Sequence, residues 1–113
     1  HKRTFCFIAD GVQMIQSLAE SKHSQGEVYN VGNEDEEVAM QDLAERIITL
    51  LGKNVKVNPL PPTKGSPERR CPSIAKLKNV ISFSKQYSLA DGINETYNWY
   101  KKNIFSGIEV SAV

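Results

Sequence analysis

One stretch organises the interpretation of this chain: Pro67-Glu68-Arg69-Arg70-Cys71-Pro72-Ser73-Ile74-Ala75-Lys76-Leu77-Lys78-Asn79. It joins a loop rich in Pro, Gly and Lys, residues 59–67, to a short amphipathic run. Arginine carries a rigid fork of donors that matches phosphate geometry, and Pro67 and Pro72 limit the backbone freedom of the pair between them. Arg69 and Arg70 therefore fit a stiffened basic loop that faces an anion. Taken alone, they fit a solvated surface turn better, since most arginines lie at surfaces.

Composition narrows the class of protein. The chain has 113 residues, a net charge of +1 and 40% hydrophobic residues, which suits one small domain. A near-neutral balance argues against a nucleic-acid binder, and no apolar run is long enough to span a bilayer. The cysteines, Cys6 and Cys71, are too few for a disulfide framework and indicate free thiols in a reducing cytoplasm. The chain opens directly on an apolar strand pattern, so we expect a domain from a longer protein.

The first third of the chain alternates between strand and helix patterns. Residues 4–9 are apolar and rich in β-formers, which predicts a strand, and Asp10 follows as a helix cap. Apolar residues then recur at helical spacing and predict a helix that buries them. A second short strand is expected at residues 28–29, ending in a turn at 30–33. The helical stripe consists of Val12, Ile15, Leu18 and Ala19.

The rest of the chain adds helices and one short strand. An apolar stripe stopped by Gly52 predicts the most regular helix, and the acidic run 34–37 before it is expected to be solvated. Residues 55–58 alternate like a strand, whereas the prolines of 59–67 cannot join a sheet interior. The stripe comprises Leu43, Ala44, Ile47, Leu50 and Leu51. Ser73 is predicted to cap a short helix through Asn79, whose buried side consists of Ile74, Leu77 and Val80. Ser88 and Asp91 are predicted to cap a last helix that ends at about Asn103. The buried side of this last helix consists of Leu89, Ile93, Tyr97, Tyr100 and Ile104.

Most catalytic patterns are absent or weak. The histidines and cysteines have no zinc-like spacing, and the glycines form no dinucleotide fingerprint. Tyr97 and Lys101 match a Tyr-x-x-x-Lys spacing, but Tyr97 lies on the apolar stripe and is predicted to be core. Anion binding is what the pattern leaves open, because strand ends and adjoining loops of α/β folds are common ligand positions. The residues available for it are Arg3, Lys64, Arg69, Arg70 and the amide of Asn30.

The order of five motifs resembles the C-terminal part of the NAD-dependent sugar-nucleotide epimerase/dehydratase family, the extended short-chain dehydrogenases. The motifs are Arg3–Asp10, Gly26–Asn33, Asp42–Ala44, Pro67–Lys76, and Leu89–Ile93 with Thr96 and Trp99. The resemblance implies an α/β fold with short strands and about four helices: a C-terminal substrate-binding lobe over residues 1–105, followed by a frayed tail over 106–113. It also implies that this lobe packs on a Rossmann lobe absent from this chain.

The resemblance implies a divided function. The Rossmann lobe of such enzymes holds NAD and supplies the Tyr-x-x-x-Lys pair, so no catalytic, NAD-binding or metal-binding residue is expected here and the chain alone should be inactive. The full protein is expected to be a cytoplasmic isomerase or lyase, an NDP-hexose 4-epimerase, 4,6-dehydratase or decarboxylase of surface-polysaccharide synthesis. The alternative is a non-catalytic binding or interaction module that kept the lobe's fold. An exposed apolar face should make the fragment self-associate.

Family roles carry over to six residues. The resemblance places Arg3 on the nucleotide diphosphate and Phe5 near the base or ribose, and it assigns Asn30 to the substrate site. The basic loop contributes Lys64, Arg69 and Arg70, and which arginine of the pair reaches phosphate stays open. Departures from the family pattern leave the base, the sugar and the outcome of the reaction undecided; they include Ala39 in place of a helix-capping Ser or Thr, Gly65-Ser66, Ser73 and Ser82-Phe83.

Overall fold

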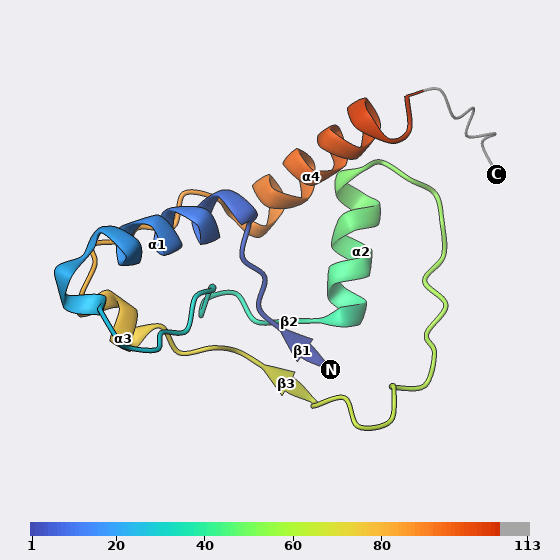
Figure 1. Ribbon diagram of the computed structural model, residues 1–113. Helices are drawn as coiled ribbons and strands as arrows, with labels where there is room; N and C mark the ends of the chain where they lie inside the picture. The colour runs from blue at the N-terminus through green and yellow to red at the C-terminus, as the bar shows by residue number, and fades with distance from the viewer. Residues whose placement is uncertain (107–113) are drawn as a thin grey trace.

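The sheet is small, and two of its three strands consist of basic residues. In the computed structural model, which describes residues 1–106, β1 (Lys2–Arg3) lies between β2 (Val38–Ala39) and β3 (Arg69–Arg70) (Figure 1). β1 runs antiparallel to β2 and parallel to β3. Backbone hydrogen bonds flank the pairing of β1 with β3, from Lys2 N to Glu68 O at 2.8 Å and from Thr4 N to Arg70 O at 3.2 Å. The sheet thus rests on backbone pairing, and strand propensity did not indicate it.

Helices make up most of the regular structure. Figure 1 shows α1 and α4 following each other along one side of the molecule, with α2 set across them. The long segment from Lys53 to Glu68 swings out from α2 and returns to β3. These elements confirm the predicted α/β fold with four helices and short strands. The helices are α1 (Ile8–Glu20), the 3₁₀ turn η1 (Lys22–Ser24), α2 (Met40–Leu50), α3 (Ala75–Lys78) and α4 (Leu89–Asn103).

Three predicted strands are wrong. Residues 4–7 belong to no strand, and Ile8 and Ala9 already belong to α1. Residues 28–29 and 55–58 also carry no strand in the described structure. β-rich sequence forms a strand only where a neighbouring strand can pair with it, and here the neighbours of β1 are taken by residues 38–39 and 69–70.

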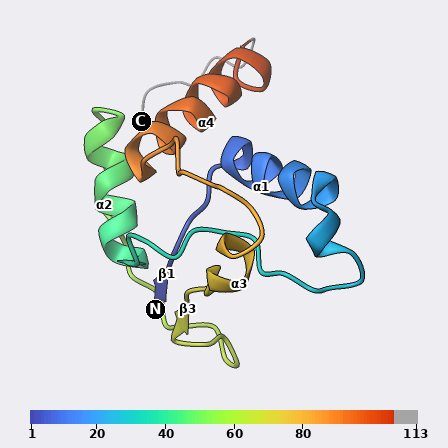
Figure 2. The same ribbon diagram turned by 90° about the vertical axis from the view of Figure 1, so that its left-hand side faces the viewer.

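The core lies between α1 and α3. Met14 and Leu77 are fully buried and Ile74 nearly so, and the packing around them is completed by Leu18, Tyr29, Ile81 and Phe83. Figure 2 shows α3 beside α1, with the segment before α4 running past both. Burial of Leu77 and Ile74 confirms the face predicted for this short helix. Its N-cap is Ile74, while Ser73 Oγ accepts only from Ala75 N at 3.5 Å.

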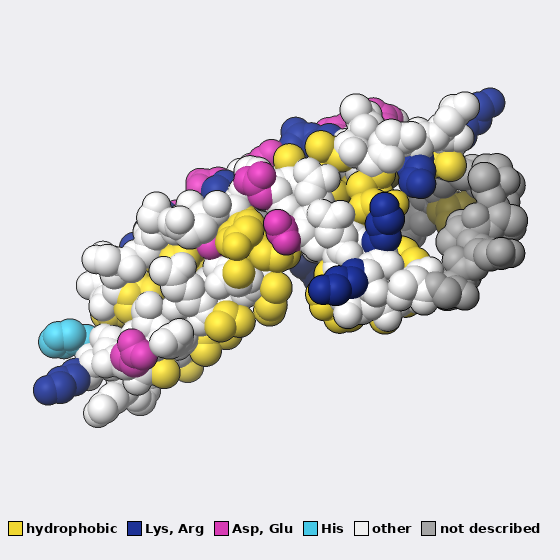
Figure 3. Space-filling model, turned by 90° about the horizontal axis from the view of Figure 1, so that it is seen from above, with side chains coloured by type: hydrophobic (Ala, Val, Ile, Leu, Met, Phe, Trp, Pro, Cys, Tyr) yellow, Lys and Arg dark blue, Asp and Glu magenta, His cyan; other side chains and the backbone are white. Residues whose placement is uncertain are grey.

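The inward face of α1 agrees with its sequence only in part. Leu18 of the expected stripe packs against the core, but Val12 and Ile15 are 52% and 59% exposed, and Met14, outside that stripe, is completely buried. α1 carries two overlapping apolar rows, and α3 packs against the one that contains Met14. The other row, Ile8, Val12 and Ile15, stays on the surface, where Figure 3 shows hydrophobic side chains gathered along the part of the molecule that carries α1.

Asp10 joins α1 to the segment that leads into α4. The residue was predicted as a cap, but it lies in the first turn of α1, whose N-cap is Phe7. Its carboxylate is buried and accepts hydrogen bonds from Gln86 N at 3.1 Å and Tyr87 N at 3.2 Å. The Tyr87 ring then packs on Phe7, with 4.6 Å between ring centroids. A buried carboxylate thus organises two segments distant in sequence.

α4 begins as predicted and packs less than predicted. Ser88 Oγ accepts from Asp91 N at 3.1 Å and the Asp91 carboxylate accepts from Ser88 N at 3.0 Å, which confirms the capping box. Leu89, Ile93 and Tyr97 are half-buried. Tyr100 and Ile104 were expected to face inward but are exposed, because the core ends before the last turns of α4 reach it. The predicted tail 106–113 lies, beyond Ser106, outside the described residues.

The start of α2 confirms a lost cap. Ala39 is its N-cap and makes no side-chain hydrogen bond, and Gly52 with φ 60° follows its end. Within residues 1–106, no helix combines the length and apolarity that crossing a membrane requires.

Candidate functional site

Arg3 and Arg70 lie side by side on neighbouring strands. The parallel register places Arg3 opposite Arg70 and Lys2 opposite Arg69. Residues opposite each other share a face of the sheet, while successive residues point to opposite faces. The register therefore brings two predicted site residues, Arg3 and Arg70, onto one face, about 5 Å apart along the pairing direction. Arg69 lies on the other.

The Arg3 guanidinium is held in place but not saturated. Its Nη1 donates to Lys2 O at 2.7 Å, and its Nη2 donates to Ser66 Oγ at 3.1 Å and Pro67 O at 2.8 Å. These bonds tie β1 to the loop that enters β3. A guanidinium has about five N–H donors, so Arg3 keeps donors for a further acceptor.

Arg70 and Lys64 have free head groups within the described structure. Both side chains are exposed, and neither forms a hydrogen bond or ion pair with any residue of 1–106. Lys64 stands in a turn closed by Ser66 N to Thr63 O, 3.1 Å, beside Gly65 at φ +82°. The structure thus brings Arg3 and Arg70 together and leaves Lys64 on the loop that leads to them.

Phe5 lies at an apolar pocket rather than among the polar groups. It is 38% exposed and follows Arg3 by two residues. The pocket has a volume of about 340 Å³ and separates the β1–α1 connection from α2 and α4. Its apolar lining suits a ring or an aliphatic side chain. The lining includes Phe5, Phe7, Leu43, Ile47, Leu89 and Ile93.

Asn30 is engaged elsewhere, and a neighbouring asparagine takes a place near β1. The Asn30 amide donates to Ser73 O at 3.2 Å and so links its segment to the start of α3. Asn33 Nδ2 donates to Phe5 O at 3.2 Å, and Asn33 Oδ1 accepts from Asp35 N at 3.1 Å. Sequence reasoning missed Asn33; its signal is an asparagine two residues before a polar turn.

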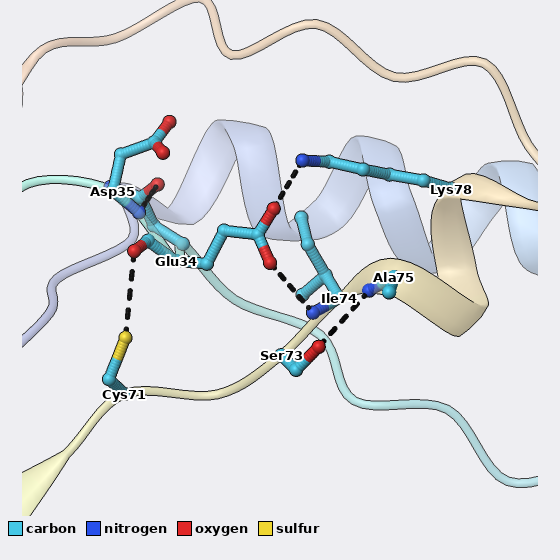
Figure 4. A network of polar contacts seen from close by, with 8 residues as sticks. Glu34, Asp35, Cys71, Ser73, Ile74, Ala75 and Lys78 are labelled. Atoms are coloured by element: carbon cyan, nitrogen blue, oxygen red, sulfur yellow. Dashed lines mark hydrogen bonds and ion pairs between the residues drawn. The ribbon is translucent and has the colours of Figure 1, made fainter.

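Glu34 anchors α3 to the segment before β2. Its carboxylate accepts from Ile74 N at 3.1 Å and from the Lys78 ammonium, while Glu34 O accepts from the Cys71 thiol at 3.5 Å (Figure 4). The acidic run was expected to be solvated, and it is instead paired. Each pair fixes a neighbouring element: Glu34 with Lys78, Glu36 with Arg46, and Glu37 with Arg69.

We expect the Glu34 anchor to weaken in acid. The hydrogen bond from Lys78, followed by that from Ile74 N, lowers the pKa of the Glu34 carboxyl below its ordinary value of 4.5. Its contribution is therefore complete above that ordinary value and is lost as pH falls through the lowered pKa. Urea unfolding between about pH 7 and about pH 3 measures this loss. In Glu34→Gln the stability should fall less over the same range; an equal fall in both proteins would contradict the anchor.

The described residues suit neither a metal nor a dinucleotide. Residues 1–106 contain no cluster of three His, Cys, Asp or Glu side chains that could hold a metal ion. The junction from β1 to α1 carries Phe5, Cys6 and Phe7 where a pyrophosphate would need glycine backbone. Burial, together with nearby Asp10, raises the pKa of the Cys6 thiol, so it is no activated nucleophile. The sheet does present the guanidinium groups of Arg3 and Arg70, which suit an anion.

Comparisons with known proteins find similar sequences and a similar solved structure. The chain is 28% identical to WbmF of Bordetella bronchiseptica, whose crystal structure is in complex with NADH; the two superpose with a TM-score of 0.75 over 94% of this chain and 31% of WbmF. It is 29% identical to a UDP-N-acetyl-alpha-D-glucosaminuronate decarboxylase of Bacillus cytotoxicus, over 88% of this chain and 32% of that protein. Over most of its length the chain is thus similar to one part of the proteins of the extended short-chain dehydrogenase family. No family model matches it.

The similarity to the extended short-chain dehydrogenases concerns only part of such a protein. A further relative, UDP-glucuronic acid decarboxylase 6 of Arabidopsis thaliana, is 31% identical over 80% of this chain and 26% of its own length. The chain thus spans between 22% and 32% of the length of these and other similar proteins. The motifs that predicted the extended short-chain dehydrogenases, and the small α/β lobe expected from them, are confirmed.

Proposed function

We propose that this chain binds the diphosphate of a nucleotide sugar in an NAD-dependent epimerase, dehydratase or decarboxylase. One observation carries the proposal: Arg3 and Arg70 share a face of adjacent strands, and Arg70 has no partner among residues 1–106. Two guanidinium groups at strand spacing match the adjacent phosphates of a diphosphate. Lys64 adds a cation from the loop, and Phe5, at the apolar pocket, lies near the base or ribose.

The names of the relatives favour a UDP-sugar acid. Two of the similar proteins are decarboxylases of UDP-linked uronic acids, so we propose UDP as the nucleotide and decarboxylation as the reaction of the whole protein. Asn30 then serves the lobe mainly through its bond to Ser73 O, which aligns the segment entering α3. The place of the reaction in polysaccharide synthesis stays a prediction.

The proposal includes a second lobe that holds NAD. WbmF binds NADH, whereas the described residues here offer no glycine turn for a dinucleotide. The exposed apolar row of α1 supports a packing partner of this kind, because a large unpaired apolar surface is unusual for a monomer. Without that partner we expect the chain to be inactive and to self-associate, which sedimentation measures.

The main experiment titrates UDP, dTDP and GDP into the complete gene product by calorimetry. We expect UDP to bind, and Arg3→Ala/Arg70→Ala to weaken it by about a hundredfold, since each charge-assisted hydrogen bond contributes about 1.5–3 kcal/mol. The matched control is Lys101→Ala/Lys102→Ala, which removes the same charge from the far end of α4. Its affinity should stay within about twofold of the unmodified protein, because surface charges at that distance are screened.

The results of this titration, together with an activity assay, distinguish an enzyme lobe from a non-catalytic binding module. Equal losses in the two double variants would show that UDP senses only net charge, and the proposal would fail. UDP binding without conversion of UDP-glucuronate in the presence of NAD favours the non-catalytic module, which shares the same arginines. Binding together with conversion supports the enzyme lobe.

A further inference from the structure

An ion pair crosses the sheet from one edge to the other. Arg69 Nε donates to both oxygens of the Glu37 carboxylate, at 2.7 and 2.9 Å. Glu37 immediately precedes β2 and Arg69 opens β3, and the strand order is β2-β1-β3. The pair therefore links the two outer strands across the central one.

The pair occupies the face opposite to the proposed diphosphate site. Lys2 is in register with Arg69 on one side and Ala39 on the other, while Arg3 is in register with Arg70 and Val38. Glu37, two residues from Ala39, shares the face of Lys2 and Arg69. The hydrogen bond from Arg69 lowers the pKa of the Glu37 carboxyl, and nearby Lys2 lowers it further, which agrees with the placement of these three residues on one face. Of the two adjacent arginines, Arg70 thus shares a face with Arg3, and Arg69 shares a face with Glu37.

β3 has little else to fix its register. It has two residues, it follows a long segment without helix or strand, and its pairing with β1 covers only two residues of each strand. No apolar side chain within β3 specifies a face, because both residues are arginines. A slip of one residue would turn Arg70 away from Arg3 and bring Arg69 in its place.

We propose that Arg69 is a positioning residue whose ion pair with Glu37 fixes the register of β3, so that Arg70 lies beside Arg3 at the diphosphate. The inference rests on the proposed function and divides the arginine pair into one ligand and one anchor. It also assigns Glu37 a role, although its charge alone would repel the ligand.

Because Glu37 is negatively charged, the two possible roles of Arg69 predict opposite changes in UDP affinity for Glu37→Ala. If Arg69 contacted phosphate, Glu37→Ala would free it and remove a negative charge, and UDP would bind as well as before or more tightly. If Arg69 is the anchor, Glu37→Ala and Arg69→Ala should each weaken UDP by about three- to fivefold, the range of an exposed ion pair. The double variant should lose no more than either single one, and the exchanged pair Glu37→Arg/Arg69→Glu should recover most of the affinity.

A second measurement keeps the inference separate from ligand binding. Hydrogen exchange of the Thr4 amide, which donates to Arg70 O, reports the register without UDP. Exchange should accelerate in Arg69→Ala and Glu37→Ala and stay slow in Arg70→Ala, whose loss should affect only UDP affinity. If the unmodified protein fails to bind UDP, the proposed function fails while the exchange data still decide whether Arg69 holds β3. Unchanged exchange in all variants, or tighter UDP binding by Glu37→Ala, overturns the inference.

Discussion

Replacing Asp10 by Ala should lower the free energy of unfolding by about 3 kcal/mol. The carboxylate is buried and accepts half-buried hydrogen bonds from the Gln86 and Tyr87 amides, and a hydrogen bond to a charged group contributes about 1.5–3 kcal/mol. Two such bonds would be lost, and the segment that carries Tyr87 onto Phe7 would lose its link to α1. Urea unfolding followed by circular dichroism measures the change.

A second carboxylate on the same helix is the control. Glu20 is exposed and accepts only from Gln16 Nε2, at 3.1 Å, so Glu20→Ala should cost no more than about 0.5 kcal/mol. Asp10→Asn, which keeps one acceptor oxygen, should fall between the two. If Asp10→Ala is no less stable than Glu20→Ala, the buried carboxylate does not hold the segment before α4.

Local sequence predicted the helices better than the strands, for a physical reason. The capping box at Ser88 and Asp91 and the stop at Gly52 act within a few residues, so α4 and α2 could be located from their own sequence. A strand depends on its partner. Lys2–Arg3 has low strand propensity, yet it forms the central strand of the sheet because residues 38–39 and 69–70 pair with it on either side.

The inward face of α1 also depends on a distant partner, which the local sequence does not reveal. Its sequence carries one apolar row with Val12 and Ile15 and another with Met14 and Leu18. Periodicity alone gives the two rows similar weight. Only the position of α3, which brings Leu77 against Met14, decides which one is buried.

The residues of the candidate site stay a prediction, and the sequence did not indicate how they lie relative to one another. The family pattern indicated Arg3 and the basic loop, and the sequence could not separate Arg69 from Arg70. Strand register supplies the distinction, because neighbouring residues of a strand point to opposite faces. Asn33 escaped prediction since its bond to Phe5 O joins segments that are 28 residues apart.

The small core explains why single residues should matter so much. The chain exposes 8757 Å², whereas a compact monomer of its mass exposes about 6,200 Å². Within the described structure, the fully buried side chains of the cluster between α1 and α3 are Met14 and Leu77. Stability is then concentrated at this cluster, and the flanking elements, including the sheet with Arg3 and Arg70, depend on it for their position.

Leu77→Ala should therefore lower the free energy of unfolding by about 3 kcal/mol, within the range of about 2–5 kcal/mol for buried leucines. Leu77 is fully buried against Met14 and Ile74, and a helix of four residues has little stability of its own to compensate. The control is the same substitution at Leu60, which is 79% exposed and should change stability by no more than about 0.5 kcal/mol. Leu77→Met, which conserves volume, should cost less than about 1.5 kcal/mol. Chemical unfolding of the three variants decides the matter: equal stability of Leu77→Ala and Leu60→Ala would mean that the contact between α1 and α3 does not hold the fold together.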